Sequence, residues 1–340
     1  PLARTDRYPF PPTAPRVRHP PVMENVQVGQ TRNFAIIGHS GDGKTSLGEA
    51  ILHRAGATAK LGHVDDGSSV LNYLPEERDG HHTASITSHV YAFDWHGHHL
   101  TLVDTPGDPN FAGDGEVAMQ ALDAVILVVD GVEGARSGTQ RMLAAAREKG
   151  LPVLGFVNGL DREYADLDAA IASLKELDVK PVLLDMPMTD SCTKGVLDLL
   201  HGKLIAADGS ESEIPDDLKD EYVLRREALV EAVAEGSDEL LERYFENGTL
   251  TDEEVLEALA VGTQSGRILP VLAGSATGEV GIDSVLQEVT ELLPSPEDRG
   301  AWEGVAVDDD SKTAVEPRAD ARLAAVIFKT VIDRYAGTLS

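Results

Sequence analysis

The sequence predicts an α/β fold in which a doubly wound, mostly parallel sheet is covered by helices on both faces. Short apolar runs with little polar interruption have the length and composition of buried parallel strands. They occur at residues 33–38, 124–130, 152–158 and 268–273. Helical patterns follow these runs at residues 45–55, 139–149 and 282–293. Such an alternation of strand and helix is typical of a parallel sheet with helices on both faces.

A glycine-rich stretch, GHSGDGKT at residues 38–45, links the first strand to the first helix. It matches the Walker A pattern of Gly, four free positions and Gly-Lys-Thr. Glycines let backbone N–H groups approach phosphates, and the positive end of the helix dipole points at the same anion. We expect Lys44 to reach the β and γ phosphates and the Thr45 hydroxyl to bind Mg²⁺. The expected nucleotide-binding residues here are His39, Ser40, Gly41, Asp42, Gly43, Lys44, Thr45 and Ser46.

The composition restricts the class of protein. A chain of 340 residues is about two domains by size. Its net charge of −29 disfavours nonspecific binding of nucleic acid, which needs clustered Lys and Arg. Residues 208–260 hold 18 acidic and 4 basic side chains, which suits either a basic protein partner or a solvated helical surface. No direct sequence-specific contact with nucleic acid is evident.

The single cysteine, Cys192, excludes an intrachain disulfide and favours a reducing compartment. No apolar run approaches the roughly 20 residues that cross a bilayer. We therefore expect a cytoplasmic protein that makes no membrane contact, and we expect a monomer.

Changes in pattern along the chain predict its domain organisation. The expected units are a disordered Pro-rich arm (1–28), a main domain (29–165 with 266–294), an inserted acidic α+β subdomain (166–265), a linker (295–320) and a further strand-containing unit (321–340). Seven prolines mark the arm, and Met23 is a possible start of the chain. A capping box at Thr251 and Glu254 opens the last of three acidic helices in the insertion.

Two smaller patterns complete the main domain. Residues 58–83 form a long polar stretch, and a loop of that length is usually functional or mobile. Strands at 86–95 and 98–104 are expected to pair through a turn at His96 and Gly97.

Four motifs in order carry a resemblance to a known family. They are GHSGDGKT at 38–45, DTPG at 104–107, the Asn158 to Asp161 spacing, and Gly274-Ser275-Ala276. Together they resemble the guanine-nucleotide motifs of translational GTPases. The insertion and the segment 323–335 look most like elongation factor G and its elongation-factor-G-like paralogues. Over about residues 31–340 the resemblance implies a P-loop GTPase domain, its inserted subdomain and the first strand of a following β-barrel, so the chain looks like an N-terminal fragment.

The resemblance also implies a function and a site. The chain is expected to bind GTP and GDP with Mg²⁺, to hydrolyse GTP and to act on the ribosome. Asp104 would hold Mg²⁺ through water, and the Gly107 N–H would sense the γ phosphate. Asp161 would accept from the guanine ring N–H and amine. Asn158, Ser275 and Ala276 would complete the base site, with the backbone N–H near Ala276 donating to the guanine carbonyl.

This chain departs from the family pattern at two functional positions. The family usually has Lys where Gly159 stands, and its stem packs over the guanine, so we predict weaker nucleotide binding. The family usually has a water-positioning His where Asp108 stands. An ionised carboxylate cannot donate a hydrogen bond and is repelled by the γ phosphate. The catalytic candidates are therefore Lys44, Gly107 and Asp108, with hydrolysis slow or dependent on another group if Asp108 points away.

A third difference concerns the Mg²⁺-binding hydroxyl of the first switch loop. Counting back from Asp104 by the family spacing assigns this role to Ser85, with Thr83 as the second choice. The expected metal ligands are Thr45, Ser85 and Asp104. Six histidines between His81 and His99 could suggest another metal site, but solvated loop histidines are the favoured interpretation.

Two functions remain open from the sequence. The first is an Mg²⁺-dependent GTPase of the ribosome. The second is a nucleotide-dependent ribosome- or protein-binding factor with little hydrolysis because of Asp108. An ATP-using P-loop protein is a third possibility, which Asp161 argues against.

Overall fold

The computed structural model describes residues 26–72, 74–78, 85–188, 192–305, 312–322, 324–333 and 337–339. The arm up to residue 25 lies outside the described residues, as do Thr83, His81 and His82. Predictions that concern these positions therefore stay predictions.

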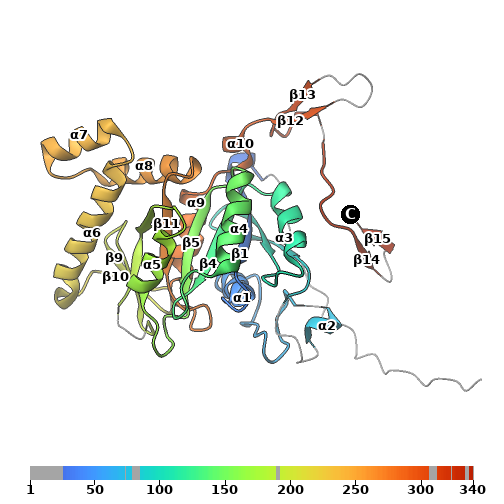
Figure 1. Ribbon diagram of the computed structural model, residues 1–340, viewed down its shortest axis with the longest axis horizontal. Helices are drawn as coiled ribbons and strands as arrows, with labels where there is room; N and C mark the ends of the chain where they lie inside the picture. The colour runs from blue at the N-terminus through green and yellow to red at the C-terminus, as the bar shows by residue number, and fades with distance from the viewer. Residues whose placement is uncertain are drawn as a thin grey trace, which may run out of the picture.

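A seven-stranded sheet forms the centre of the molecule (Figure 1). Its spatial order is β2, β3, β1, β4, β5, β11, β6. The strands are β1 (Thr31–Gly38), β2 (His89–Trp95), β3 (His98–Asp104), β4 (Ala124–Asp130), β5 (Val153–Asn158), β6 (Pro181–Leu183) and β11 (Leu269–Ala273). All neighbours pair in parallel except β2 and β3, which form the expected antiparallel hairpin. This arrangement confirms the predicted α/β fold class.

Helices cover both faces of this sheet. Successive residues of a strand point to opposite faces, so each apolar strand contributes side chains to two separate cores. Phe34 and Ile36 of β1 belong to one apolar core and Ala35 and Ile37 to the other. The first core includes residues of α1 (Lys44–Arg54), α6 (Lys219–Ala234), α8 (Asp252–Gln264) and α9 (Ile282–Glu291). The second includes residues of α3 (Ala112–Ala118), 3-10 helix η2 (Met119–Ala121), α4 (Ser137–Glu148) and α5 (Leu167–Lys175). Helix α3 is an element that the sequence patterns did not predict.

The expected insertion begins inside the main sheet. Strand β6 is the edge strand of this sheet and pairs with β11, so the first strand of the expected insertion belongs to the main sheet. Pairing with β6 covers the backbone groups that β11 would otherwise leave open. A separate antiparallel sheet follows, made of β7 (Asp185–Pro187), β8 (Gly195–Asp198), β9 (Lys203–Ala206) and β10 (Glu211–Ser212).

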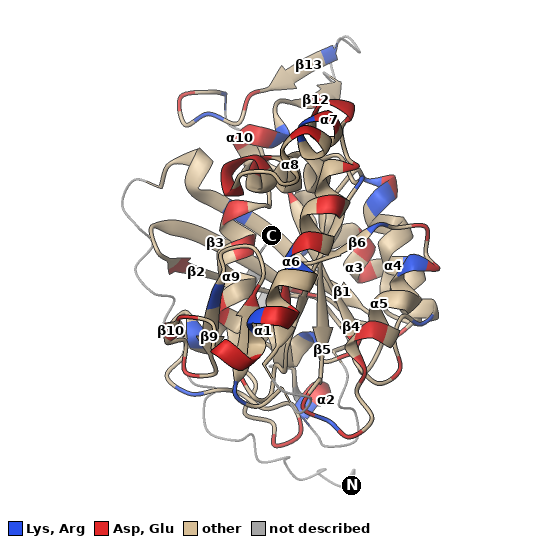
Figure 2. Ribbon diagram, turned by 90° about the vertical axis from the view of Figure 1, so that its left-hand side faces the viewer, with Lys and Arg blue, Asp and Glu red and all other residues tan. Residues whose placement is uncertain are grey.

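Three helices extend from the insertion, with α7 (Asp238–Asn247) between α6 and α8. Acidic residues are spread over them in Figure 2. The predicted capping box is present: the Glu254 N–H donates to Thr251 Oγ1 over 3.2 Å, and the Thr251 N–H donates to Glu254 Oε2 over 2.9 Å. None of the described helices combines the length and apolar character that crossing a membrane requires.

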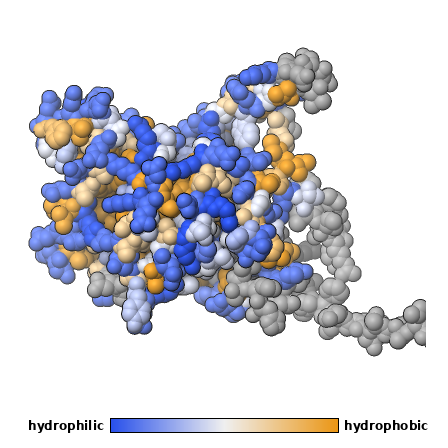
Figure 3. Space-filling view, in the orientation of Figure 1, coloured by the Kyte–Doolittle hydropathy of each residue, from blue (hydrophilic) through white to orange (hydrophobic). Residues whose placement is uncertain are grey.

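The C-terminal part differs from the sequence expectation. The expected linker contains helix α10 (Pro296–Arg299) and a paired ladder of β12 (Trp302–Val305) and β13 (Lys312–Val315). In the further strand-containing unit expected at 321–340, the described residues form strand β14 (Val331–Asp333), which pairs with β15 (Gly337–Leu339). Before β14, Val326 and Ile327 are 56% and 71% exposed, and Figure 3 shows apolar residues gathered along this segment.

Candidate functional site

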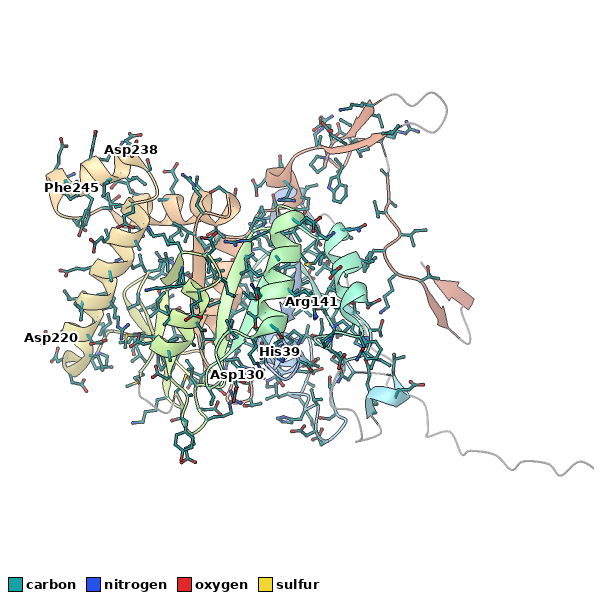
Figure 4. All side chains as sticks on the ribbon, viewed as in Figure 1. His39, Asp130, Arg141, Asp220, Asp238 and Phe245 are labelled. Atoms are coloured by element: carbon teal, nitrogen blue, oxygen red, sulfur yellow. The ribbon has the colours of Figure 1, made fainter. Side chains whose placement is uncertain are left out.

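The sequence motifs meet at the carboxyl end of the parallel strands. This edge is where open α/β sheets bind ligands. Strands β1, β3 and β5 end there at Gly38, Asp104 and Asn158. In Figure 4, His39 and Asp130 mark this edge, whereas Asp220, Asp238 and Phe245 lie away from it on helices α6 and α7.

A cavity of about 270 Å³ lies over the glycine-rich loop. Its lining is Ser40, Gly41, Gly43, Lys44, Thr45, Ser46, Val64, Asp65, Ser85, Thr105 and Gly107. Three separate segments thus contribute: the glycine-rich loop with the start of α1, the loop after β3, and the long polar stretch together with Ser85 just after it. Val64 and Asp65 were not predicted, because the polar stretch carries no motif around them.

Two glycines are required by close approaches at this cavity. Gly43 has a φ of 87°, and a Cβ there would collide with the Asn158 amide nitrogen. A Cβ at Gly107 would collide with Lys44 Nζ and would lie 2.8 Å from the Ser40 backbone nitrogen. Glycine at both positions therefore keeps the cavity open and lets the two loops touch.

Lys44 is buried beneath this cavity, with 6% of its surface exposed. Its Nζ donates to the His39 carbonyl oxygen over 2.7 Å. Burial lowers the pKa of Lys44, while the nearby carboxylates of Asp104 and Asp42 raise it. A phosphate oxygen in the cavity is a stronger acceptor than the carbonyl and would satisfy the same ammonium group.

The side chains of His39 and Asp42 brace the loop against helix α4. Asp42 accepts from the His39 N–H over 2.9 Å and forms an ion pair with Arg136. His39 Nδ1 accepts from the Gly138 N–H over 3.1 Å. Among the described residues, neither side chain is part of the cavity lining, so any contact with phosphate comes from the backbone around them.

The three expected metal ligands lie together. Thr45 Oγ1 is 2.7 Å from Asp104 Oδ2 and 3.0 Å from Ser85 Oγ. Ser85 Oγ is also 3.2 Å from Asp104 Oδ2, and Asn72 Oδ1 accepts from it over 3.1 Å. Thr83, the second choice for the hydroxyl ligand, lies outside the described residues.

The environment of Asp104 fits a small divalent cation. This carboxyl is fully buried, and its Oδ1 has no hydrogen-bond partner among the described residues. Burial raises the pKa of Asp104, while hydrogen bonds from Thr45 and the charge of Lys44 oppose that rise. Mg²⁺ takes oxygen ligands and keeps several waters, so two hydroxyls and one carboxylate are a suitable set.

Asn158 joins the phosphate loop to the expected base site. Its Nδ2 donates to the Asp42 carbonyl oxygen over 2.9 Å, and its Oδ1 accepts from the Ala276 N–H over 2.9 Å. The Leu160 N–H also donates to the Gly274 carbonyl oxygen over 3.1 Å. The loops after β5 and β11 are therefore held against each other by residues far apart in the sequence.

Asp161 follows in the first of these loops. Its Oδ1 is closed off from solvent and has no hydrogen-bond partner in the described part of the chain. Because an unpaired buried polar oxygen is costly, this atom is suited to accept from a ligand. Ser275, in contrast, accepts from the Gly278 N–H over 3.0 Å and shapes the turn.

Arg162 fills the space beside Gly159. A Cβ at Gly159 would lie 2.5 Å from Arg162 Nε, and the Arg162 guanidinium pairs with Asp130 over 2.6 Å. Burial opposes ionisation of Asp130, but hydrogen bonds from Arg162 and from the Glu133 and Val132 N–H groups hold its pKa below the ordinary value. The space beside Gly159 is therefore filled by Arg162, although the Lys that the family usually has at this position is absent. The motif comparison did not predict this packing.

Asp108 is turned into its own loop. Its Oδ1 accepts from the backbone and side-chain N–H groups of Asn110, both over 2.8 Å. Among the described residues it is not part of the cavity lining, although its neighbour Gly107 is. The carboxylate thus forms a local turn and does not face the phosphate position directly.

Two buried glutamates anchor the long polar stretch. Glu49 of α1 accepts from Ser69 Oγ over 2.6 Å and from the Leu71 N–H over 2.9 Å. Glu77, in the short helix α2 (Pro75–Arg78), lies 2.9 Å from His89 Nε2. A single glutamate in a helix or in a polar stretch gives no sequence signal, so these anchors were missed.

Comparison with known proteins agrees with the motifs. The Elongation factor Tu GTP binding domain family matches residues 29–295. Elongation factor G of Thermotoga petrophila is 33% identical over 330 residues, covering 93% of this chain and 47% of that protein. Elongation factor G of Thermotoga neapolitana is 34% identical over 322 residues, covering 92% and 46% respectively.

A crystal structure of a Thermus thermophilus protein superposes with a TM-score of 0.77 and 28% identity, covering 91% of this chain and 44% of that one. The chain spans about half the length of the curated relatives that it matches. The matched domain leads to one conclusion: this protein belongs to the Elongation factor Tu GTP binding domain family, and along nearly its whole length it is similar to elongation factor G.

Proposed function

We propose that this chain binds GTP and GDP with Mg²⁺, hydrolyses GTP and acts on the ribosome in the cytoplasm as an elongation-factor-G-like translation factor. One observation carries the proposal: Asn158 links the phosphate loop to Ala276 while Thr45, Ser85 and Asp104 meet at the cavity edge. These contacts support a phosphate cradle, a cation site and a base site at one end of the sheet.

The phosphate end of the site acts through charge and position. Lys44 and the loop N–H groups would bind the β and γ phosphates, and the Gly107 N–H would sense the γ phosphate. Thr45, Ser85 and Asp104 are the residues that would hold Mg²⁺, which neutralises phosphate charge when bound. These residues come from three segments, so loss of the γ phosphate would release contacts that tie those segments together.

The base end of the site supports guanine over adenine. Guanine presents a ring N–H and an amine that one carboxylate can accept together, and Asp161 has an unpartnered, solvent-excluded oxygen among the described residues. Adenine lacks the ring N–H. In the proposed complex, Asp161 reads the base, and the neighbouring Arg162 keeps its loop packed through Asp130. Because the Ala276 N–H is bonded to Asn158, a neighbouring group would donate to the guanine carbonyl.

A second function is favoured by the contacts of Asp108. Its carboxylate is bonded to Asn110, so the expected position of the water-orienting group lacks a hydrogen-bond donor. A protein with this arrangement would bind GTP and turn it over slowly. Such a protein would serve as a nucleotide-gated ribosome- or protein-binding factor.

The experiment that separates the two functions is GTP turnover by the full-length protein with Mg²⁺, with and without ribosomes. Ribosome-stimulated turnover by the wild type supports the GTPase. Tight GTP binding with turnover gained only in Asp108→His supports the binding factor. Failure of the wild type to bind GTP at all would overturn both.

Two further variants assign the cause of any change in turnover. Asp108→Ala tests whether removal of the carboxylate suffices. Asn110→Ala is the matched control, because it removes the side-chain donor to Asp108, keeps the backbone N–H that also donates to Asp108, and leaves the charge of Asp108 in place.

A further inference from the structure

We propose that His201, Glu288 and Glu291 form a binding site for one Zn²⁺-class divalent metal ion between the inserted subdomain and helix α9. One nitrogen of His201 and one carboxylate oxygen of each glutamate lie within 4.8 Å of one another. The site is separate from the nucleotide cavity, which contains none of these residues in its lining. None of the sequence motifs pointed to it.

Two structural units bring the ligands together. Glu288 and Glu291 are three residues apart in α9, so their side chains lie on one face of the helix. His201 lies in the turn between β8 and β9 of the small antiparallel sheet. Contact between these units is direct, because Lys203 Nζ of β9 lies 3.4 Å from Gln287 Oε1 of α9. Figure 2 shows β9 and β10 on the side of the molecule where α9 and α1 lie.

Glu288 is the observation that points to a cation. It is 2% exposed, and its Oε2 has no hydrogen-bond partner among the described residues. Burial, followed by the charges of Glu291 and Asp198, raises the pKa of Glu288 well above its ordinary value. An unpartnered buried carboxylate oxygen is costly, and a bound metal ion would supply the partner that Glu288 Oε2 lacks among the described residues.

The His201 imidazole has partners within the protein, but they leave Glu288 Oε2 without a hydrogen bond among the described residues. His201 Nδ1 is 2.8 Å from Asp198 Oδ2, and His201 Nε2 is 3.3 Å from Glu291 Oε2. Hydrogen bonds to Asp198 and Glu291 raise the pKa of His201 to about 10. A histidine binds metal through the neutral ring, so metal binding at His201 competes with protonation of the imidazole.

Asp198 orients the histidine as metal sites require. Its Oδ1 accepts from the Leu200 and His201 N–H groups, both over 2.9 Å, which fixes the carboxylate in place. Its Oδ2 then accepts a hydrogen bond from His201 Nδ1 and directs Nε2 toward α9. Carboxylate-bonded histidines of this kind are the usual arrangement behind a zinc ligand. The Gln287 amide lies 3.2 Å from Nε2, and a metal would displace it.

The ligand types select the metal class. One imidazole nitrogen with two carboxylates suits Zn²⁺, with water completing the shell, whereas Mg²⁺ and Ca²⁺ prefer oxygen ligands. Zinc bonds of about 2.0–2.2 Å bring the donors closer together than 4.8 Å. His201 and Glu291 are partly exposed, so their side chains can rotate to close the shell around the buried Glu288.

The test is calorimetric titration of Zn²⁺ into metal-stripped protein held saturated with GDP and excess Mg²⁺. Wild type should bind one Zn²⁺ at this site, and His201→Ala, Glu288→Gln and Glu291→Gln should bind it at least about tenfold more weakly. Both glutamine variants keep side-chain volume, and circular dichroism checks that each variant is folded. Asp198→Asn should weaken binding by about 10–100-fold as a positioning residue.

His53→Ala is the matched control. His53 Nδ1 pairs with Glu279 Oε1 over 2.6 Å without belonging to the three-residue cluster, so its loss should leave the titration unchanged. Co²⁺ gives a second readout, since coordination by His201 should produce visible absorption bands that disappear in Glu288→Gln. Equal Zn²⁺ affinity in wild type, His201→Ala and Glu288→Gln, or no binding by the wild type, would overturn the proposal.

Discussion

Thr45 Oγ1 donates a 2.7 Å hydrogen bond to Asp104 Oδ2, which connects the first turn of α1 to the last residue of β3. Ser85 closes this pair into a triangle at 3.0 Å and 3.2 Å. The Ser85 hydroxyl, from the segment before β2, thus contacts both Asp104 of β3 and Thr45 of α1. Any cation held at this triangle would tie the three segments together.

Replacing Ser85 by Ala should raise the Mg²⁺ concentration needed for GTP binding by about tenfold, because one polar contact to a charged group is lost. Ser85→Thr retains the hydroxyl and serves as the control. Binding of a fluorescent GTP analogue across a Mg²⁺ titration measures the effect. Identical Mg²⁺ dependence in wild type and Ser85→Ala would show that Ser85 is not a ligand.

Replacing Asp161 by Asn should exchange guanine for xanthine specificity. The carboxylate can accept from the guanine amine, whereas an amide can donate to the carbonyl that xanthine has at that position. We expect GTP binding to weaken by about 10–100-fold and xanthosine triphosphate binding to be gained. Competition binding with both nucleotides is the measurement, and Glu163→Gln, an exposed change in the same loop, is the control. A folded variant that loses GTP without gaining the xanthine nucleotide would contradict the assignment.

Gly159→Ala should destabilise the fold more than Gly56→Ala. Both glycines have positive φ, of 75° and 72°, so both changes carry backbone strain of about 1–2 kcal/mol. Only at Gly159 does the new Cβ also meet Arg162, while nothing lies within 4 Å at Gly56. The Arg162 guanidinium has to move away from Asp130 to make room, so we expect up to about 1 kcal/mol of additional loss in the free energy of unfolding, measured by urea denaturation. Arg162→Ala combined with Gly159→Ala should remove most of that addition, and equal losses at the two glycines would refute the close packing of Arg162.

Cys192 should be unreactive in the folded protein at about pH 8, below the ordinary thiol pKa. Its thiol is buried, and burial, followed by the charges of Asp185 and Asp161, raises its pKa from 9.0 to about 12. Because the unfolded thiol ionises first, this group's contribution makes stability fall as pH rises from 9.0 to about 12. Iodoacetamide labelling with and without urea measures the reactivity, and Cys192→Ala should remove this part of the pH dependence. Rapid labelling of the native protein would contradict the prediction.

The sequence determined the architecture because its signals are local and repeated. Apolar runs such as residues 124–130 can be read as buried strands without knowing their neighbours, and β4 occupies those same residues. The glycine-rich loop is also local, since eight consecutive residues, 38–45, specify its turn and the start of α1. The ordered motifs were sufficient to predict the family. The ligand-binding roles of their residues remain predictions.

Tertiary structure decided which distant groups meet. Nothing in the sequence indicates that Arg162, three residues after Gly159, pairs with Asp130 at the end of β4. Strand β6 joins the main sheet because β11 offers an open edge. His201 and Glu288 are separated by a long stretch of chain, so only folding brings an unpartnered buried carboxyl of the described residues to an oriented imidazole. The periodicity of apolar residues predicts local secondary structure. Contacts between residues that are far apart in the sequence depend on the tertiary fold, so periodicity does not predict them.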